Sequence, residues 1–354
     1  MAHETVNALL KKPSEWLRGV GPSSDIVISS RIRLARNLEP HPFATRATKT
    51  SQGEVLKMVK DGVLKTGLKH PLTLDMGELD EVDRQFLVER HLISREHVMH
   101  PERKAVIIGE GEVVSIMINE EDHLRIQAMQ SGMNLKDAWT LINGLDDEFS
   151  EVLPYAYSSD WGYLTCCPTN TGTGMRASVM VHLPSLVITK QINKVLHTIT
   201  KLGLTARGLF GEGTEASGNF FQISNQVSLG RSEEELIENI ERILREVVHQ
   251  EQTAREALMA NNRTQLEDRI WRAFGVLQHA KTITSTEALD LLSAVRLGAD
   301  LTLMNSGVDR TVVNELFIFS QPAHLQKLEG KTLTAKERDT KRAELIRRRL
   351  GGQA

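Results

Sequence analysis

Cysteine is nearly absent from this chain of 354 residues, because Cys166 and Cys167 are the only two. Neighbours in sequence cannot form an ordinary structural disulfide with each other, and so few cysteines indicate a reducing compartment, most simply the cytoplasm. Long apolar runs are absent as well: none approaches the roughly 18 residues of a membrane-spanning helix, and the N-terminus lacks the apolar core of a signal peptide. We therefore expect a cytoplasmic protein without a membrane segment.

A large excess of one charge is also missing. Lys and Arg number 43 and Asp and Glu 46, which gives a formal net charge of −3. This balance argues against a protein that binds nucleic acid directly. The basic run Arg347 to Arg349 is more typical of a solvated helix face than of a DNA-binding one. No H-E-x-x-H motif or zinc-type Cys/His spacing occurs, so we assign no metal-ligating residue.

Short β-branched runs alternate with helical stretches between residues 24 and 230. The runs that predict strands are DIVISSRIRL, KAVIIG, EVVSIMI, GYLTCC, ASVMVHLP, LTARGLF and NFFQISNQ. Hairpin-like strands outnumber evenly spaced βαβ units. This pattern favours an α+β fold, with an antiparallel sheet flanked by helices. We assign residues 1–235 to this domain.

The pattern becomes helical after Ser232. A helical period continues for about thirty residues, and further helical segments follow to the C-terminus. Three helix starts carry the S/T-x-x-E capping box, at Ser232 with Glu235, Thr284 with Glu287, and Thr334 with Glu337. We therefore expect an all-helical C-terminal domain over residues 236–354.

The segment INEEDHLR (118–125) places three successive carboxylates before a histidine and an arginine. The run before it, 112–118, alternates like a strand. The run after it has apolar residues spaced three and four apart, which predicts a helix. On this pattern alone, the carboxylates would cap the helix and interact with its dipole. Catalytic use of the same carboxylates is the competing interpretation.

Two nucleotide-binding motifs can be set aside. Gly330-Lys331-Thr332 resembles the end of a P-loop, but position 325 is Leu where the motif needs Gly. GTGMRA (172–177) fits the dinucleotide fingerprint, but the SVMVHLP that follows it predicts a strand and not the required helix.

Arginines at the edges of predicted elements are a more informative signal. Arg31 and Arg33 are two residues apart and so share one face of a strand. Arg125, Arg176 and Arg207 lie beside turns or polar segments. Each alone is more typical of a solvated or ion-paired surface residue. Together they suggest a different use, because the planar guanidinium fork suits phosphate oxygens and several arginines could hold a triphosphate.

Four long motifs carry a family resemblance. SSRIRLARN, NEEDHLR, CPTNTGTGMRASV and RGLFGEGTEASGNFFQISN occur in this order between residues 24 and 230 and resemble the signatures of the guanidino (phosphagen) kinases. The resemblance implies an antiparallel sheet flanked by helices, ATP and Mg²⁺ as cofactors, and transfer of the γ-phosphoryl group to a guanidinium nitrogen.

The acidic segment acquires a role from this resemblance. A guanidinium group has a pKa of about 12.5–13.8, so its nitrogen needs a base and a fixed position before it can attack phosphorus. By resemblance, Glu121 is the base, Glu212 brackets the guanidinium from the other side, and Cys167 lies against it. Glu120 and Asp122 are implied to be supports, as caps or through water bound to Mg²⁺.

The resemblance also implies a nucleotide site. Its residues in this sequence are Ser29, Ser30, Arg31, Ile32, Arg33, His91, Arg125, Arg176, Ala177, Ser178, Val179, Met180, Arg207, Gly208, Leu209, Phe210 and Gly211. The arginines would hold the phosphates, and Ser178 to Met180 would line the purine and ribose. Met180 departs from the family, which commonly has His at this position.

Two further departures point to the acceptor. Only 28 residues precede Ser29, where other guanidino kinases carry a helical domain with a loop that closes over a small substrate. We therefore expect an open acceptor side. The added C-terminal helices resemble the branch of the family that phosphorylates arginine in other proteins. This branch implies a homodimer, a small zinc-binding activator protein, and substrates that are stress regulators or damaged proteins destined for a Clp-type protease.

Three alternatives compete with this interpretation. A kinase for a small guanidino metabolite shares the chemistry but needs a lid. A catalytically inactive adaptor would be expected to lose a phosphate-binding arginine or a catalytic Glu, and none is missing. A DNA-binding regulator would depend on the basic C-terminal run alone.

The last predicted helix contains RDTKRA (338–343). Arg338 and Arg342 are four residues apart and project from one face, with Asp339 beside them. Spacing alone favours a salt-bridged exposed helix. The pattern also resembles a phosphoarginine pocket of the same branch, formed by Arg338, Asp339, Arg342 and Ala343, which implies an allosteric response to phosphoarginine.

Overall fold

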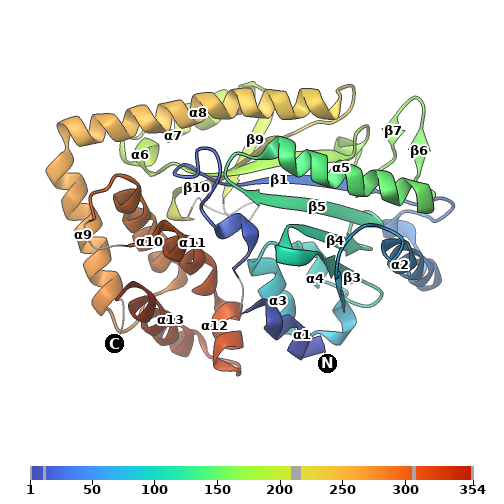
Figure 1. Ribbon diagram of the computed structural model, residues 1–354, viewed down its shortest axis with the longest axis horizontal. Coiled ribbons are helices and arrows are strands. Elements are labelled where there is room, and N and C mark those ends of the chain that lie inside the picture. Colours follow the sequence, from blue (N-terminus) through green and yellow to red (C-terminus); the bar gives the residue numbers. More distant parts are fainter. Residues whose placement is uncertain (1, 11–12, 209–216, 305–307, 352–354) are drawn as a thin grey trace.

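The structure is a computed structural model that describes residues 2–10, 13–208, 217–304 and 308–351. Its centre is an eight-stranded sheet with the strand order β2-β3-β4-β5-β1-β8-β10-β9 (Figure 1). The strands are β1 Val27–Arg36, β2 Leu72–Asp75, β3 Ala105–Ile108, β4 Val114–Ile118, β5 Leu124–Ser131, β8 Met175–His182, β9 Leu204–Gly208 and β10 Phe220–Asn225. Every pair of neighbours is antiparallel. A small hairpin, β6 Tyr157–Ser158 and β7 Gly162–Tyr163, lies outside the sheet.

Helices cover both faces of the sheet (Figure 1). In the first part of the chain they are α1 Ala2–Leu9, α2 Lys49–Val63, α3 Glu81–Glu89, α4 Arg95–Val98, α5 Leu135–Val152, α6 Pro184–Ile188 and α7 Ile192–Lys201. The C-terminal helices are α8 Glu233–Asn261, α9 Arg263–His279, α10 Ser285–Asp300, α11 Arg310–Phe319, α12 Pro322–Glu329 and α13 Ala335–Leu350. The predicted antiparallel sheet, flanking helices and helical C-terminal region are confirmed.

The two faces of the sheet differ in chemistry, because strand side chains alternate. On one face, Ile32, Ile126 and Val179 are fully buried and belong to a core that α5 and α8 complete. On the other face, the central strands carry polar and charged side chains, among them Arg31 and Arg33. The apolar face therefore holds the fold together, and the polar face is available for a ligand.

The prediction of a helix from His123 onward is wrong. Residues 124–131 form strand β5, which pairs with β4 on one side and β1 on the other. A helix begins only at Leu135. Leu124, Ile126 and Ala128 are buried on the core face, a spacing of two that Met129 on the opposite face obscured in the sequence. The acidic segment therefore lies at a strand-to-strand turn, where it caps no helix.

Other local predictions hold or need adjustment. GYLTCC contributes only the two residues of β7 to a strand. The capping boxes at Ser232 and Thr334 form in both directions, and Thr284 accepts the hydrogen bond expected from the backbone of Glu287. The division of the chain after residue 235 stays a prediction. None of the described helices is long and apolar enough to cross a membrane.

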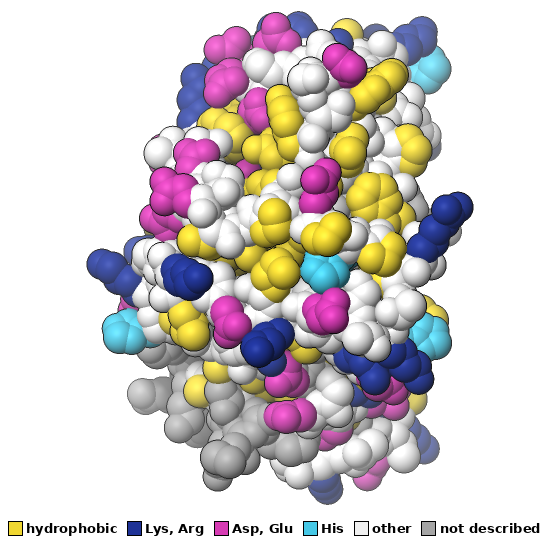
Figure 2. Space-filling model, turned by 90° about the vertical axis from the view of Figure 1, so that its right-hand side faces the viewer, with side chains coloured by type: hydrophobic (Ala, Val, Ile, Leu, Met, Phe, Trp, Pro, Cys, Tyr) yellow, Lys and Arg dark blue, Asp and Glu magenta, His cyan; other side chains and the backbone are white. Residues whose placement is uncertain are grey.

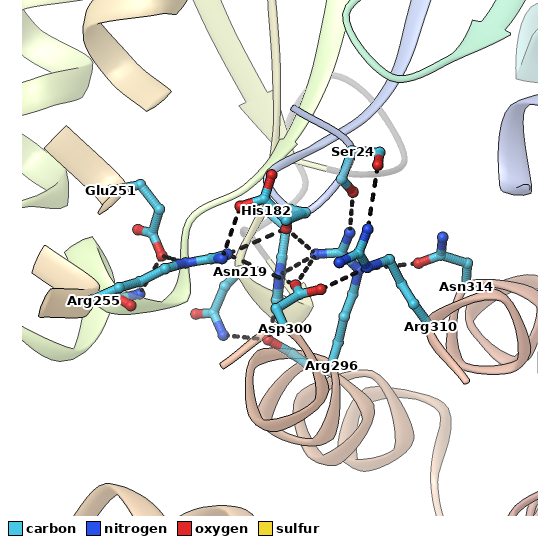
Figure 3. Close-up of polar contacts among 12 residues, drawn as sticks. Ser24, His182, Asn219, Glu251, Arg255, Arg296, Asp300, Arg310 and Asn314 are labelled. Carbon is cyan, nitrogen blue, oxygen red and sulfur yellow. Dashed lines mark hydrogen bonds and ion pairs between the residues drawn. The ribbon is translucent and has the colours of Figure 1, made fainter. Parts of the chain in front are cut away.

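Buried ion pairs join the helical region to the sheet (Figure 3). Asp300 of α10 accepts hydrogen bonds from Arg296 Nη1 at 3.2 Å and from Arg310 Nε of α11 at 2.6 Å. Arg296 also donates through Nη2 to the backbone oxygen of Ser24, at 2.9 Å, and through Nη1 to His182 Nδ1 of β8, at 2.9 Å. These contacts fix α10 and α11 relative to β8 and to the segment before β1.

Exposed side chains of both charges are interspersed on the face drawn in Figure 2, and hydrophobic side chains gather in its upper part. Tyr157 and Trp161 of the hairpin region are more than half exposed. The charge pattern of this face agrees with the small net charge of the sequence, since no extended area carries positive charge alone.

Candidate active site on the polar face of the sheet

Strand register brings the predicted arginines together. Arg33 of β1 lies opposite Arg176 of β8, and Ala35, two residues further along β1, lies opposite Arg125 of β5. Since residues two apart share a face, Arg31 and Arg33 point to the same side as Arg125 and Arg176. On the outer strands, Arg207 of β9 lies opposite Gln222 of β10.

The arginines of this face repel one another. Burial, and then the neighbouring charges of Arg125 and Arg176, lower the pKa of Arg31 to about 10. Burial, followed by the charges of Arg31, Arg125 and Arg176, also lowers the pKa of Arg33 well below its usual value. Arg33 Nε is buried without an acceptor among the described residues. A polyanion placed here would relieve the repulsion, so the face is suited to a triphosphate.

Arg31 is held by neighbouring strands. Its Nε donates to Ser178 Oγ of β8, at 3.3 Å, and its Nη2 donates to Gln222 Oε1 of β10, at 2.8 Å. Sequence reasoning missed Gln222. Its position in NFFQISN, two residues before Ser224, was the available signal, because alternation places both on the polar face.

Several predicted nucleotide-site residues point away from this face. Ile32, Ala177 and Val179 are fully buried in the core on the opposite side. Ser30 Oγ donates to the backbone oxygen of Gly132 at 2.8 Å and accepts from the backbone of Asn134, at 2.9 Å, so it anchors the start of α5. Their side chains are therefore structural. Gly208 ends β9, and Leu209, Phe210, Gly211 and Glu212 lie outside the described residues.

The turn between β4 and β5 is fixed by its first residue. Asn119 has a positive φ of 60°, a conformation that Asn tolerates better than most residues. Its Nδ2 donates to the backbone oxygens of Gln52 and Arg103, both at 2.8 Å, and its backbone N–H donates to the oxygen of His123 at 2.9 Å. The turn is thereby attached to α2 and to the segment before β3.

Glu120 is buried and serves as a support. Its carboxylate accepts from Arg125 Nη1 at 2.7 Å, from Ser94 Oγ at 2.7 Å and from the backbone of Glu121, at 2.9 Å. Burial alone would raise the pKa of Glu120, but Arg125 and these hydrogen bonds outweigh it, so the pKa lies below its usual value. Glu120 therefore remains an anion that positions Arg125.

Glu121 is exposed at the tip of the turn. Partial burial, and then the negative charge of Asp122, raise the pKa of Glu121 above its usual value, although Arg125 opposes the shift. A raised pKa makes a carboxylate a stronger base. Glu121 therefore has the accessibility and the basicity that its predicted role needs.

Asp122 connects the turn to the cysteine segment. Its Oδ1 accepts from Asn37 Nδ2 at 2.6 Å and from the backbone of Cys166, at 2.7 Å. Burial raises the pKa of Asp122, and these hydrogen bonds oppose the shift. Cys167 follows, half-buried, with Sγ 3.0 Å from Thr169 Oγ1. The residue before Cys167 is thus bonded to the acidic turn, and the role of Cys167 beside the acceptor stays a prediction. Asn37 is a support that sequence reasoning missed.

The other end of the polar face contains Ser29, His91 and Met180. Together with Arg31, Ser178 and Gln222 they line a narrow crevice, to which Trp16 and Met129 also contribute. Burial, and then the charge of Arg31, lower the pKa of His91 to about 3, so its ring is neutral near pH 7. Ser178 and Met180, which were predicted to line the purine and ribose, are therefore brought together, whereas the side chain of Val179 lies in the core.

The RDTKRA segment lies far along the chain on α13. Arg342 is 2% exposed and donates to the backbone oxygens of Ser320 and Ile283, both at 2.8 Å, and to Asp339 Oδ1 at 2.6 Å. Arg338 is half-buried and donates to the backbone oxygen of Leu333 at 2.8 Å. Ala343 is fully buried. Arg342 thus has a structural role, in addition to any role in binding a ligand.

Comparison with known proteins places the chain in a family. Residues 54–254 match the model "ATP:guanido phosphotransferase, C-terminal catalytic domain", and residues 263–354 match "Protein-arginine kinase McsB C-terminal domain". A protein-arginine kinase of Halothermothrix orenii is 51% identical over 96% of this chain and 97% of its own length. The chain belongs to the protein-arginine kinases. One from Desulforamulus reducens is 49% identical over 95% of both chains.

Solved structures of guanidino kinases share the fold of this kinase. The duplicated taurocyamine kinase of Schistosoma mansoni superimposes with a TM-score of 0.60 at 28% identity, over 66% of this chain and 34% of that one. A lombricine kinase gives a TM-score of 0.58 at 25% identity, over 68% of this chain and 71% of that one.

Proposed function

We propose that this kinase transfers the γ-phosphoryl group of Mg-ATP to arginine side chains of proteins. The observation that carries the proposal is the placement of a repelling arginine cluster beside an exposed carboxylate of raised pKa. Arg31, Arg33, Arg125 and Arg176 share one face, and Arg125 is bonded to the residue that precedes Glu121. The names of relatives that match nearly the whole chain agree with a protein acceptor.

The reaction divides the work between these two groups. The arginines hold the phosphates and neutralise the charge that develops as the bond between the γ-phosphorus and the bridging oxygen breaks. The acceptor guanidinium loses a proton to the Glu121 carboxylate as its nitrogen forms the new bond to phosphorus, and ADP leaves. Cys167 and Glu212 complete the acceptor side in this proposal.

Mg²⁺ would arrive with the nucleotide. The described residues contain no group of three or more His, Cys, Asp or Glu side chains that could hold a metal ion, and Glu120 and Asp122 already accept hydrogen bonds from Arg125 and Asn37. The ion would neutralise phosphate charge, and contacts of these two carboxylates to it would pass through water.

The proposal can be tested by following the transfer of label from ATP and by locating the modified residues with mass spectrometry. The kinase would be incubated with labelled Mg-ATP, an unfolded protein and free arginine together. We expect acid-labile label on arginine residues of the protein. Label on free arginine alone would show that a small guanidino compound is the substrate and would overturn the proposal.

The remaining proposals concern the cellular setting. We propose a cytoplasmic homodimer that acts in a stress response, with a small zinc-binding protein as activator and a Clp-type protease that degrades the phosphorylated proteins. Val276 of α9 and Leu328 of α12 are more than a third exposed, which supports a contact surface on the helical region. Light scattering of the purified kinase would test the dimer, and phosphoproteomics of cells with and without Glu121→Ala would identify the substrates.

We also propose that Arg338, Asp339, Arg342 and Ala343 form a second site that binds phosphoarginine and regulates the kinase. Arg338 and Asp339 are partly exposed on one helix, next to the buried Arg342. Regulation of this kind requires that phosphoarginine bind two states of the kinase with different affinity.

A further inference from the structure

Trp16 has an unusual environment for a buried tryptophan. It lies in the short helix η1 (Glu15–Leu17) ahead of β1 and is 3% exposed. Its indole Nε1 is buried and has no acceptor among the described residues. Indole nitrogen can only donate a hydrogen bond, and a buried donor without a partner costs free energy. Buried tryptophans usually find a partner for this group, so the group needs an explanation.

Trp16 also occupies a particular place relative to the nucleotide site. It lines the crevice that contains Ser29, Arg31, His91, Met180 and Gln222. Its ring meets the ring of His91 edge-on, with centroids 5.3 Å apart. Trp16 and Met180 also line a second, apolar crevice, whose other walls are Leu17, Ile28, Phe220, Asn314, Phe317 and Ile318. Trp16 therefore lies between a crevice with polar walls and an apolar one.

The order of residues along β1 shows which part of a nucleotide would reach this region. Ala35, opposite Arg125, lies next to the acidic turn, and Arg33, Arg31 and Ser29 follow at intervals of two residues. Each interval is about 6.6 Å, so Ser29 lies roughly 20 Å from Ala35 along the strand. With the γ-phosphate beside Arg125 and Glu121, the opposite end of an extended nucleotide reaches Ser29, Met180 and Trp16.

We propose that Trp16 recognises the base of the nucleotide, by donating its indole N–H to an acceptor nitrogen on the edge of the purine. This inference is founded on the proposed nucleotide site. Met180 and the rings of His91 and Phe220 supply the apolar surfaces that a purine face needs. The indole N–H satisfies one ring nitrogen and is itself satisfied only when the nucleotide is bound.

The segment that carries Trp16 is held from two sides. Ser14 Oγ donates to Glu112 Oε2 at 2.7 Å, and Glu112 is paired with the buried Arg90, which precedes His91. On the other side, Asn314 Nδ2 of α11 donates to the backbone oxygen of Leu17 at 3.2 Å. The donor is thus positioned before the nucleotide arrives, and the helical C-terminal region contributes to its position.

The test compares the binding of several nucleotides to several variants of the kinase. Calorimetry would measure the affinities of ATP and its 1-deaza, 3-deaza and 7-deaza analogues for the wild type, Trp16→Phe and Trp271→Phe. Loss of one neutral hydrogen bond weakens binding about 3- to 10-fold. We expect the wild type to bind one analogue more weakly than ATP by such a factor. Trp16→Phe should bind ATP with the affinity that the wild type has for this analogue, and it should bind ATP and the analogue equally well. Trp271→Phe is changed at an exposed site on α9 and should behave like the wild type.

Two results distinguish a failure of this inference from a failure of the proposed nucleotide site. If Trp16→Phe retains the full discrimination of the wild type, Trp16 is a packing residue and the inference is wrong. Arg31→Ala serves as the reference for the nucleotide site, because it should weaken ATP and all three analogues by the same factor. If Arg31→Ala binds ATP as the wild type does, the proposed nucleotide site itself is wrong. A turnover number at saturating ATP within about threefold of the wild type would show that Trp16→Phe leaves the phosphoryl-transfer site intact.

Discussion

Arg125 donates from Nη1 to both carboxylate oxygens of Glu120, each at 2.7 Å. The backbone N–H of Glu121 donates to the same carboxylate. One buried anion therefore positions the proposed phosphate-binding cation and the proposed base together. Because Glu120 is engaged in these contacts, Glu121 is the carboxylate of the turn that remains exposed for an acceptor.

The first prediction follows from this division of roles. Glu121→Gln should lower the turnover number about 10²- to 10⁴-fold, because it removes the base, while the affinity for ATP stays near that of the wild type. Kinase assays and calorimetry would measure the two quantities. Glu96→Gln is the matched control, since Glu96 is an exposed carboxylate that acts electrostatically on Glu121 from outside the turn. Loss of ATP affinity as the main defect would assign Glu121 to the nucleotide site instead.

The pH dependence of the reaction provides a second prediction. Glu121 must be deprotonated to accept a proton, so kcat/KM should fall as pH falls through its pKa, which burial and Asp122 raise above the usual 4.5. Asp122→Asn removes one of the negative charges that raise this pKa. The acidic limb of the profile should therefore move to lower pH in that variant. A limb that moves to higher pH, or one that Glu121→Gln leaves unchanged, would contradict the assignment.

The third prediction concerns Arg33, which is repelled by three other arginines. Arg33→Ala should weaken ATP binding and phosphoryl transfer together, because a phosphate contact is lost. The same change should increase the free energy of unfolding of the nucleotide-free kinase, because repulsion is relieved. Lys should rescue activity poorly, since it lacks the planar fork. Denaturant unfolding and binding assays on both variants would check this, and full rescue by Lys would indicate generic electrostatics.

The sheet could be predicted from the sequence because its strands carry a local signal. Alternation identified β1, β4 and β8, and the arginines of one strand face followed from their spacing of two. The strand β5 could not be assigned, because its apolar residues occupy both faces and only pairing with β4 and β1 distinguishes it from a helix. Residue spacing therefore yielded the arginines of the site but misplaced the turn that holds Glu121.

Contacts between distant segments were beyond prediction. Asn37 and Asp122 are 85 positions apart, and nothing in either segment indicates the other. The same holds for Arg296 and Ser24, whose contact spans 272 positions. Trp16 and Gln222 were missed because a single polar or aromatic residue in a strand or loop has no distinctive pattern. The family motifs named Ile32 and Val179 as nucleotide-site residues, whereas strand alternation places their side chains in the core.

The fourth prediction tests the buried ion pairs of Figure 3. Asp300 is buried between Arg296 and Arg310, with Arg255 nearby. Asp300→Ala would leave these arginines without their shared anion, which should lower the free energy of unfolding by about 3–5 kcal/mol. Chemical denaturation would measure the change. Asp268→Ala removes an exposed ion pair with Arg272 on α9 and should have no measurable effect. Equal stability of both variants would show that the network contributes little.

The last prediction concerns the proposed phosphoarginine site on α13. In the structure Asp339 is paired with Arg342, and Arg342 also bonds the backbone of Ser320 and Ile283. The guanidinium of a bound phosphoarginine must therefore compete with Arg342 for Asp339, and the phosphoryl oxygens must reach Arg338. Arg342→Ala would disturb packing as well as binding, so it cannot isolate the site.

Arg338→Ala combined with Asp339→Ala disturbs the packing less, because both side chains are partly exposed and Arg342 keeps its bonds to the backbone of Ser320 and Ile283. We expect phosphoarginine to bind the wild type in calorimetry and to change its kinase rate, and the double variant to lose both responses while keeping its basal rate. Lys341→Ala is the control, since Lys341 lies on the same helix and pairs with Glu329 and Glu344. If the double variant still responds, or the wild type binds no phosphoarginine, this helix is a charged surface and any regulation acts elsewhere.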